Sequence, residues 1–279
     1  MICFMFPGQP LVHDAALPVD DDFTVIADLT RSLTGLDLAS FTWNGTGTSE
    51  QVALQVYGTA MSLYHHRRLC RDGRRPAIIA EHSMGIYPAL AACGSLPEGD
   101  ALTLTHRVGS CLATIAEGAH YALGCVIGLT AIPLLAIAEN NGVFLANRNT
   151  SRHFLLAGEK HAIEAAMAEA LASGAFSVRT FPCDAPLHTP LIEAIAPRLE
   201  EIVNDYSFAE PAVRMMEHIE QDFLAAADIP GFLVRELCLP VNWEATYLAL
   251  RRAGVTAWHE TGSGDSLKKY NRWIASEHP

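Results

Sequence analysis

The chain has 279 residues, of which 50% are hydrophobic and 18% are charged, and its formal net charge is −12. This size and composition fit a globular protein with one large domain, or a large domain and a small insert, and exclude a mainly disordered chain. The acidic balance argues against a nucleic-acid-binding protein, because contacts with phosphates require lysine and arginine.

The first predicted element is a buried strand over residues 1–6, which lacks the basic region of a signal peptide. Residues 14–48 predict short helical pieces and turns, and residues 51–70 predict a helix. Glycines and a proline interrupt the long apolar stretch 121–138, so we expect a strand and a helix there rather than a membrane span. The seven scattered cysteines form no C-x-x-C pair, which predicts reduced thiols and a cytoplasmic protein.

Residues 77–93 predict a strand, a sharp turn with a serine, and a helix. The run 77–80 is apolar, Ser83 follows it directly, and the next ten residues are rich in alanine and leucine. A nucleophile elbow, G-x-S-x-G, has this form, because it exposes the serine Oγ at the end of a strand beside a helix N-terminus. Gly85 supplies the second small residue, but Glu81 stands in place of the first. We expect a local shift or a cation partner to accommodate the Glu81 carboxylate, which would otherwise crowd the turn and repel an anionic substrate.

The middle of the chain predicts a small subdomain. A helix over 97–117 precedes a β-α-β-β-α-β pattern, the order of a ferredoxin-like unit. The pattern comprises strands over 121–129, 142–146, 154–158 and 175–181 and helices over 131–139 and 160–173. The predicted fold is α/β, with a hydrolase-like parallel-sheet core over 1–118 and 187–279 and an inserted ferredoxin-like small subdomain over 119–186.

The C-terminal part predicts a helix over 191–203, loops and short segments over 204–230, and two helices over 231–237 and 244–253. A final strand over 255–260 precedes a tight turn and a last helix. The chain shows no internal repeat.

A serine at an elbow needs a base to take its proton, and histidine is the usual base. Of the twelve histidines, His188 has the best context, because prolines bracket its loop between a strand and a helix. The backbone N–H of Met84 and the loop that ends at Gln9 are candidate donors to an oxyanion. This apparatus serves acyl transfer and ester hydrolysis equally. No histidine or cysteine spacing is typical of a metal site, and no phosphate-binding loop is present.

Motifs spread along nearly the whole chain resemble those of the malonyl-CoA:acyl carrier protein transacylases and the acyltransferase domains of polyketide and fatty-acid synthases. They occur in the family's order and at roughly its spacing. The motifs are F-P-G-Q at 6–9, E-H-S-M-G at 81–85, A-N-R-N at 146–149, A-P-L-H at 185–188, P-V-N-W at 240–243 and E-T-G-S-G at 260–264.

The resemblance implies a ping-pong mechanism. Ser83 would attack the thioester of malonyl-CoA, and His188 would act first as base and then as acid for the leaving thiol. The acyl group would pass from Ser83 to the phosphopantetheine thiol of acyl carrier protein. The backbone N–H groups of Gln9 and Met84 would stabilise the oxyanion. The resemblance implies no cofactor beyond the coenzyme A thioester. The histidine and cysteine spacing, the acidic composition and the interrupted apolar stretch predict no metal, no nucleic acid and no membrane.

The resemblance also implies roles around the substrate. On its position alone, Arg107 flanks an apolar helix stripe and fits a surface arginine, whereas the resemblance implies that it clamps the malonyl carboxylate. Asn147 would line the cleft, and Leu187 would limit the pocket to small acyl groups. Glu236 belongs to this group because its backbone carbonyl would orient His188. Its side chain could also supply the carboxylate of a triad-like arrangement.

Other functions are compatible with the same residues. One is an acyl-thioester hydrolase that acts on carrier-bound acyl groups, and another is the acyltransferase component of a malonate decarboxylase. A third is a non-catalytic subunit that binds coenzyme A or a carrier protein.

Overall fold

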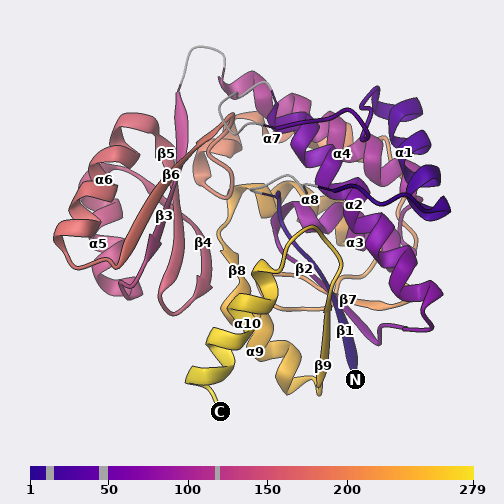
Figure 1. Ribbon diagram of the computed structural model, residues 1–279. Coiled ribbons are helices and arrows are strands. Elements are labelled where there is room, and N and C mark those ends of the chain that lie inside the picture. The colour runs from indigo at the N-terminus through magenta and orange to yellow at the C-terminus, as the bar shows by residue number, and fades with distance from the viewer. Residues whose placement is uncertain (11–15, 44–49, 117–119) are drawn as a thin grey trace.

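Two β-sheets lie side by side, each with its own helices (Figure 1). The computed structural model describes residues 1–10, 16–43, 50–116 and 120–279. None of the helices in these ranges is long and apolar enough to cross a membrane. All seven cysteines are free thiols, as the sequence predicts.

The larger part of the molecule is built on a four-stranded parallel sheet with the order β7-β2-β1-β9. Its strands are β1 (Ile2–Phe6), β2 (Ile78–Glu81), β7 (Arg214–Met216) and β9 (Ala257–Glu260). Both faces of the sheet are buried, as is usual for parallel sheets: Phe4 and Ile79 point into one core cluster, and Cys3 and Ile78 point into another. The coarse prediction of an α/β fold with a parallel sheet is confirmed.

Helices cover both faces of this sheet. On one face lie α3 (Ile86–Ala92), α4 (Glu98–Ala113), α7 (Ala196–Asn204) and α8 (Ile229–Cys238). On the other lie α9 (Trp243–Arg252) and α10 (Ser266–Glu277). A further pair, α1 (Asp21–Thr34) and α2 (Gln51–Arg71), packs against α4 (Figure 1).

The second sheet has the order β6-β3-β5-β4-β8. Its strands are β3 (Tyr121–Ile127), β4 (Phe144–Thr150), β5 (His153–Glu159), β6 (Ser177–Cys183) and β8 (Val241–Asn242). Helices α5 (Ala131–Asn141) and α6 (Lys160–Ala172) pack on it, so the elements follow the predicted β-α-β-β-α-β order. The parallel pairing of β8 with β4 joins this sheet to the C-terminal part of the chain. The division into two subdomains stays a prediction, and its first boundary, at residue 118, lies outside the described residues.

Two elements differ from the sequence prediction. Residues 21–34 form one helix, begun by the Asp20 side chain, which accepts a hydrogen bond from the N–H of Phe23. Residues 214–216 form the edge strand β7 inside a stretch predicted to be loop. A strand of three residues is too short to show the alternation by which strands are recognised.

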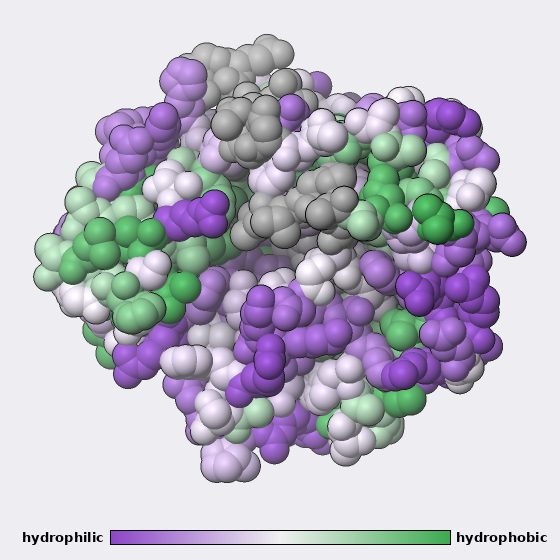
Figure 2. Space-filling view, in the orientation of Figure 1, coloured by the Kyte–Doolittle hydropathy of each residue, from purple (hydrophilic) through white to green (hydrophobic). Residues whose placement is uncertain are grey.

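The surface of the small sheet's helices is partly hydrophobic. Figure 2 shows hydrophobic residues gathered over α5 and α6, and Ile132, Leu135 and Leu171 are exposed large side chains of these two helices. Nothing in the structure shows what would cover them.

Candidate active site

The nucleophile elbow forms as predicted. Ser83 has a φ of +56°, a left-handed conformation that non-glycine residues seldom adopt. A Cβ atom on Gly85 would lie 2.1 Å from the backbone oxygen of Phe6, so only glycine lets the elbow approach the end of β1 this closely. The turn thus presents the Ser83 side chain beyond the carboxyl ends of β1 and β2.

His188 meets Ser83 across 105 positions of sequence. The Ser83 Oγ lies 2.7 Å from His188 Nε2, and His188 Nδ1 donates to the backbone carbonyl of Glu236 at 2.8 Å. This second bond fixes the tautomer with Nε2 as acceptor, so the Ser83 hydroxyl donates to it. The His188 backbone N–H also donates to the carbonyl of Leu237 at 2.7 Å. This bond helps to hold the His188 backbone in its left-handed conformation, with a φ of +61°.

Burial lowers the pKa of His188 to about 3, with the neighbouring His218 adding to the effect. The imidazole is therefore neutral at ordinary pH and free to accept a proton. The arrangement is that of a general base beside an activated nucleophile.

The two predicted oxyanion donors lie on either side of the serine. Met84 follows it in the first turn, and Gln9 follows β1 in the adjacent loop. A Cβ on Gly8 would be 3.4 Å from Ser83 Cβ, so this loop contacts the elbow directly. The Met84 side chain is buried in the core, which leaves only its backbone for such a role. That these two N–H groups bind an oxyanion stays a prediction.

A cavity of about 1190 Å³ opens at Ser83 between the two sheets. Gln9, Asn147, Leu187 and His188 line it together with the serine, so the structure brings five of the eight predicted site residues to one cavity. Amide side chains from the loop and from α2 form a chain on its wall: Gln55 donates to Gln9 at 3.1 Å, and Gln9 donates to Gln51.

Positively charged side chains line the same cavity from the small sheet and α10. They are Arg152, Arg179 and Lys269, all exposed. Arg179 stacks on the ring of Phe181, with 4.8 Å from its Cζ to the ring centroid. These cations would meet an anionic group that enters between the sheets.

Arg107 is not among these residues, and its position does not support the predicted carboxylate clamp. Its guanidinium binds the Asp205 carboxylate at 2.5 Å and lies 5.5 Å from the centroid of the Tyr206 ring. Neither Arg107 nor its two partners line the cavity. The same helix reaches the cavity with Gly109 and Leu112 instead, so Arg107 projects from another side of α4.

Glu236 is grouped with the predicted substrate-binding residues, but its side chain does not reach the cavity. Its backbone carbonyl orients His188, as expected, but its side chain is fully buried and does not line the cavity. The carboxylate lies behind the histidine, with Oε2 at 3.6 Å from His188 Nδ1.

Glu81 has a partner that the sequence did not reveal. His218 Nδ1 lies 2.6 Å from one carboxylate oxygen of Glu81 and 2.8 Å from the other. His218 Nε2 in turn lies 4.0 Å from Glu236 Oε2. His218 follows the unpredicted strand β7, and the adjacency of β7 to β2 was the missing signal.

A second buried chain supports the elbow from the other side. His82 Nε2 lies 2.9 Å from Asn149 Oδ1, and the Asn149 amide donates to His153 Nδ1 at 2.9 Å. This chain ties the elbow to β4 and β5 across the cavity floor. Burial lowers the pKa values of His82 and His153 to about 4, so both rings stay neutral.

Within the described ranges, one group of three or more acidic, histidine or cysteine side chains brings its polar atoms within 4.8 Å of one another: His188, His218 and Glu236. His188 already uses Nδ1 to donate to a carbonyl, so that nitrogen has no lone pair for a cation. We interpret the group as an acid–base cluster. The absence of a metal from the mechanism stays a prediction.

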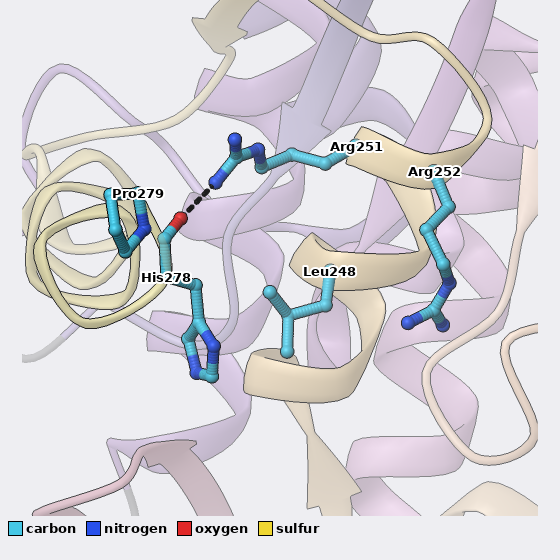
Figure 3. A pocket seen from close by; sticks show the side chains of 5 residues that line it. All are labelled: Leu248, Arg251, Arg252, His278 and Pro279. Atoms are coloured by element: carbon cyan, nitrogen blue, oxygen red, sulfur yellow. Dashed lines mark hydrogen bonds between the residues drawn. The ribbon is translucent and has the colours of Figure 1, made fainter.

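Figure 3 shows a smaller pocket of about 330 Å³ between α9 and the C-terminal residues, none of whose lining residues borders the Ser83 cavity. There Arg251 donates to the backbone carbonyl of His278 at 2.5 Å. The pocket offers no nucleophile, and we assign it no role.

The chain is similar to known proteins along most of its length. The malonyl CoA-acyl carrier protein transacylase of Escherichia coli strain K12 is 27% identical over 280 residues, which cover 95% of this chain and 89% of the relative. The corresponding protein of Bacillus subtilis strain 168 is 29% identical over 211 residues, 72% of this chain and 67% of its own.

Solved structures show the same fold. The malonyl CoA-acyl carrier protein transacylase of Coxiella burnetii superposes with a TM-score of 0.89 at 24% identity, over 99% of this chain and 91% of that one. The family described as the acyl transferase domain matches residues 25–231, nearly three quarters of the chain. The chain therefore belongs to the acyl transferase domain family.

Proposed function

We propose that the protein transfers a malonyl group from coenzyme A to the phosphopantetheine thiol of acyl carrier protein through an acyl-enzyme on Ser83. The 2.7 Å contact between Ser83 Oγ and His188 Nε2, at the mouth of a large cavity, is the observation that carries the proposal. The names of the relatives supply the substrate and the carrier, since both comparisons at 27–29% identity are with malonyl CoA-acyl carrier protein transacylases.

The first half-reaction follows from the contacts. The Ser83 hydroxyl gives its proton to His188 Nε2 as Oγ bonds to the thioester carbonyl carbon. The backbone N–H groups of Gln9 and Met84 would bind the oxyanion. The carbon–sulfur bond then breaks, and the His188 imidazolium returns the proton to the departing thiolate.

The second half-reaction reverses these steps with the carrier's thiol as nucleophile. His188 takes the thiol proton, sulfur attacks the acyl carbon, and the proton returns to Ser83 Oγ. One histidine serves both halves because its proton is released each time the intermediate collapses.

The cavity suits a substrate with an acyl end and a phosphate-bearing arm. Arg152, Arg179 and Lys269 line it and would bind phosphate groups of coenzyme A or of the carrier's prosthetic arm. For the malonyl carboxylate the cavity offers the amide of Gln55 and the guanidinium groups of the small sheet, while Leu187 and Asn147 would limit the acyl group's size.

We further propose that the second sheet is a ferredoxin-like subdomain set into a hydrolase-like core, with the substrate held between them. The reaction needs no cofactor other than the coenzyme A thioester. The free thiols fit a reducing compartment, so we place the reaction in the cytoplasm.

Intact-protein mass spectrometry tests the proposal. The folded protein, mixed with malonyl-CoA, is expected to gain one malonyl mass, peptide mapping should place it on Ser83, and Ser83→Ala should abolish it. Addition of holo acyl carrier protein should then transfer the label to the carrier. Loss of the label to water at the same rate with and without carrier would identify a hydrolase instead. No adduct with malonyl-, acetyl- or longer acyl-CoA would overturn the proposal.

A further inference from the structure

We propose that Glu81, His218 and Glu236 form a buried positioning chain that places a carboxylate beside the His188 imidazolium while Ser83 is acylated. The inference deepens the proposed function and rests on it for the acyl substrate, although it concerns the Ser83–His188 pair whatever acyl group is carried.

Three separate elements supply the chain. Glu81 ends β2, His218 follows β7, and Glu236 lies on α8. Exposure of all three residues is 0%. Their polar atoms form a row that leads to the serine: Glu81 to His218 at 2.6 Å, His218 to Glu236 at 4.0 Å, and Glu236 to His188 at 3.6 Å.

The centre of this row has unused hydrogen-bonding groups. His218 Nε2 and both carboxylate oxygens of Glu236 have no hydrogen-bond partner, although all are buried. Buried polar groups left without partners destabilise a protein, so such a cluster in a core calls for a reason other than packing. We infer that these atoms share one proton, which either Glu236 or His218 Nε2 can hold.

The contact with Glu81 makes His218 a suitable acceptor for the shared proton. In the tautomer whose Nδ1–H donates to the Glu81 carboxylate, only Nε2 remains to gain or lose a proton, and Nε2 lies 4.0 Å from Glu236 Oε2. A protonated His218 would then lie between two carboxylates, which keeps its charge compensated inside the protein.

The chain acts when the serine reacts. The Ser83 proton moves to His188 Nε2 and creates an imidazolium whose Nδ1–H already points to the Glu236 backbone oxygen at 2.8 Å. The Glu236 carboxyl turns toward His218 Nε2, closes the 4.0 Å between them and gives that nitrogen the shared proton. The Glu236 carboxylate, 3.6 Å from His188 Nδ1, thus becomes negative as the His188 ring becomes positive. No proton leaves the cluster, and both transfers reverse when His188 gives its proton to the leaving thiol.

Other titratable groups face this chain. His82 lies on the elbow, Tyr87 on α3 and Glu217 at the end of β7. The Glu217 carboxylate accepts backbone N–H groups of its own turn, from Ile219 and Glu220 among others. The Tyr87 hydroxyl is buried without a hydrogen-bond partner, and burial raises its pKa, so it remains neutral.

The test measures the reactivity of Ser83 without an acyl substrate. Diisopropyl fluorophosphate forms a bond from Ser83 Oγ to phosphorus as fluoride leaves and the serine proton passes to His188. The inactivation rate is followed by intact mass from pH 4 to pH 9 for the wild type and for Glu236→Gln, His218→Asn and Glu81→Gln.

We expect the plateau rate of Glu236→Gln and of His218→Asn to fall about tenfold or more. The rate of each variant should stay at its plateau down to pH 4, because the pKa of His188 is about 3 in the wild type and loss of the nearby negative charge lowers it further. Glu81→Gln should lower the plateau rate by less, because it leaves Glu236 and His218 in place. The double variant of Glu236 and His218 should be no slower than the worse single variant, since both remove the same carboxylate.

His66→Asn is the matched control. His66 packs against Phe4 and Phe6 and makes no hydrogen bond or ion pair with Glu81, His218 or Glu236, so its loss should affect thermal stability and leave the plateau rate unchanged. Circular dichroism verifies that each variant is folded. If a variant does not fold, ¹⁵N spectra of the wild-type histidines, with and without the diisopropylphosphoryl adduct on Ser83, decide whether His218 becomes protonated when His188 does.

Unchanged plateau rates in folded Glu236→Gln and His218→Asn would overturn the inference. So would a stoichiometric metal in the purified protein, because His218 Nε2 would then bind the metal and not a proton. Failure of the proposed function looks different: the wild type would react with the fluorophosphate but form no acyl-enzyme from any acyl-CoA.

Discussion

The Ser83–His188 pair depends on two residues held in left-handed backbone conformations, with φ values of +56° and +61°. Such conformations cost about 1–3 kcal/mol each and persist where the surroundings impose them. The hydrogen bonds of His188 to the carbonyls of Glu236 and Leu237 are part of that support. The distance between Ser83 and His188 thus depends on the position of α8 as well as on the elbow.

Also at the residue scale, Arg107→Ala tests the corrected clamp. The Arg107 guanidinium is engaged with Asp205 and Tyr206 outside the cavity, so the variant should keep the wild-type ratio of malonyl to acetyl transfer. Stability should change by about 0.5 kcal/mol or less, because the pair is exposed. Acylation rates of Ser83 with the two acyl-CoAs give the ratio.

Asp205→Ala removes the other member of the same pair and serves as the control for Arg107→Ala. The two variants should behave alike. A selective loss of malonyl transfer in Arg107→Ala alone would return Arg107 to the substrate.

At the scale of elements, the elbow turns from β2 into α3 within a few residues. This connection works because Gly85 lies against the end of β1, where a side chain would meet backbone atoms. Backbone cannot move aside as the end of a flexible side chain can. The position of the loop that carries Gln9 therefore depends on the glycine.

Gly85→Ala should destabilise the protein by about 2 kcal/mol or more and slow the acylation of Ser83, since its Cβ would lie 2.1 Å from the Phe6 oxygen. Urea unfolding and acylation kinetics measure the two effects. Gly231→Ala in α8 is the comparison: a Cβ there meets nothing within 4 Å, and alanine favours a helix by about 1 kcal/mol. Equal stability of the two variants would contradict the close approach at the elbow.

At the scale of the whole molecule, the site lies between two sheets, and one short segment connects β6 to His188. Asp184 lies in this segment and lines the cavity with a carboxylate oxygen that has no hydrogen-bond partner. Burial raises the pKa of Asp184 to about 6. The ionised form of Asp184 is therefore less stable in the folded protein than in the unfolded chain.

Asp184 should make the free energy of unfolding depend on pH. Between about pH 4 and pH 6 the folded protein binds a proton that the unfolded chain releases, so this group makes stability fall as pH rises. The fall should be about 1 kcal/mol after allowance for solvent screening. Urea unfolding at several pH values should show a shallower decline for Asp184→Asn, and a curve as steep as that of the wild type would contradict the assignment.

The sequence by itself determined the features that depend on neighbouring residues. The strand, turn and helix around Ser83 follow from an apolar run, a glycine and a helix-forming segment within 17 residues. His188 could be chosen from twelve histidines because its loop is fixed by local prolines and matches a family motif. The order of strands and helices in the small sheet followed from periodicity alone, which is also a local property.

Only the tertiary structure decided where charged side chains point and what they meet. Arg107 pairs with a residue 98 positions away, and Glu81 with one 137 positions away. The physical reason is that a buried or half-buried charge is stabilised by whatever group packing brings near it, and packing depends on the order of strands in the sheet. Once β7 lies beside β2, His218 reaches Glu81, and the residue that looked like a defect in the elbow becomes the end of a buried acid–base chain.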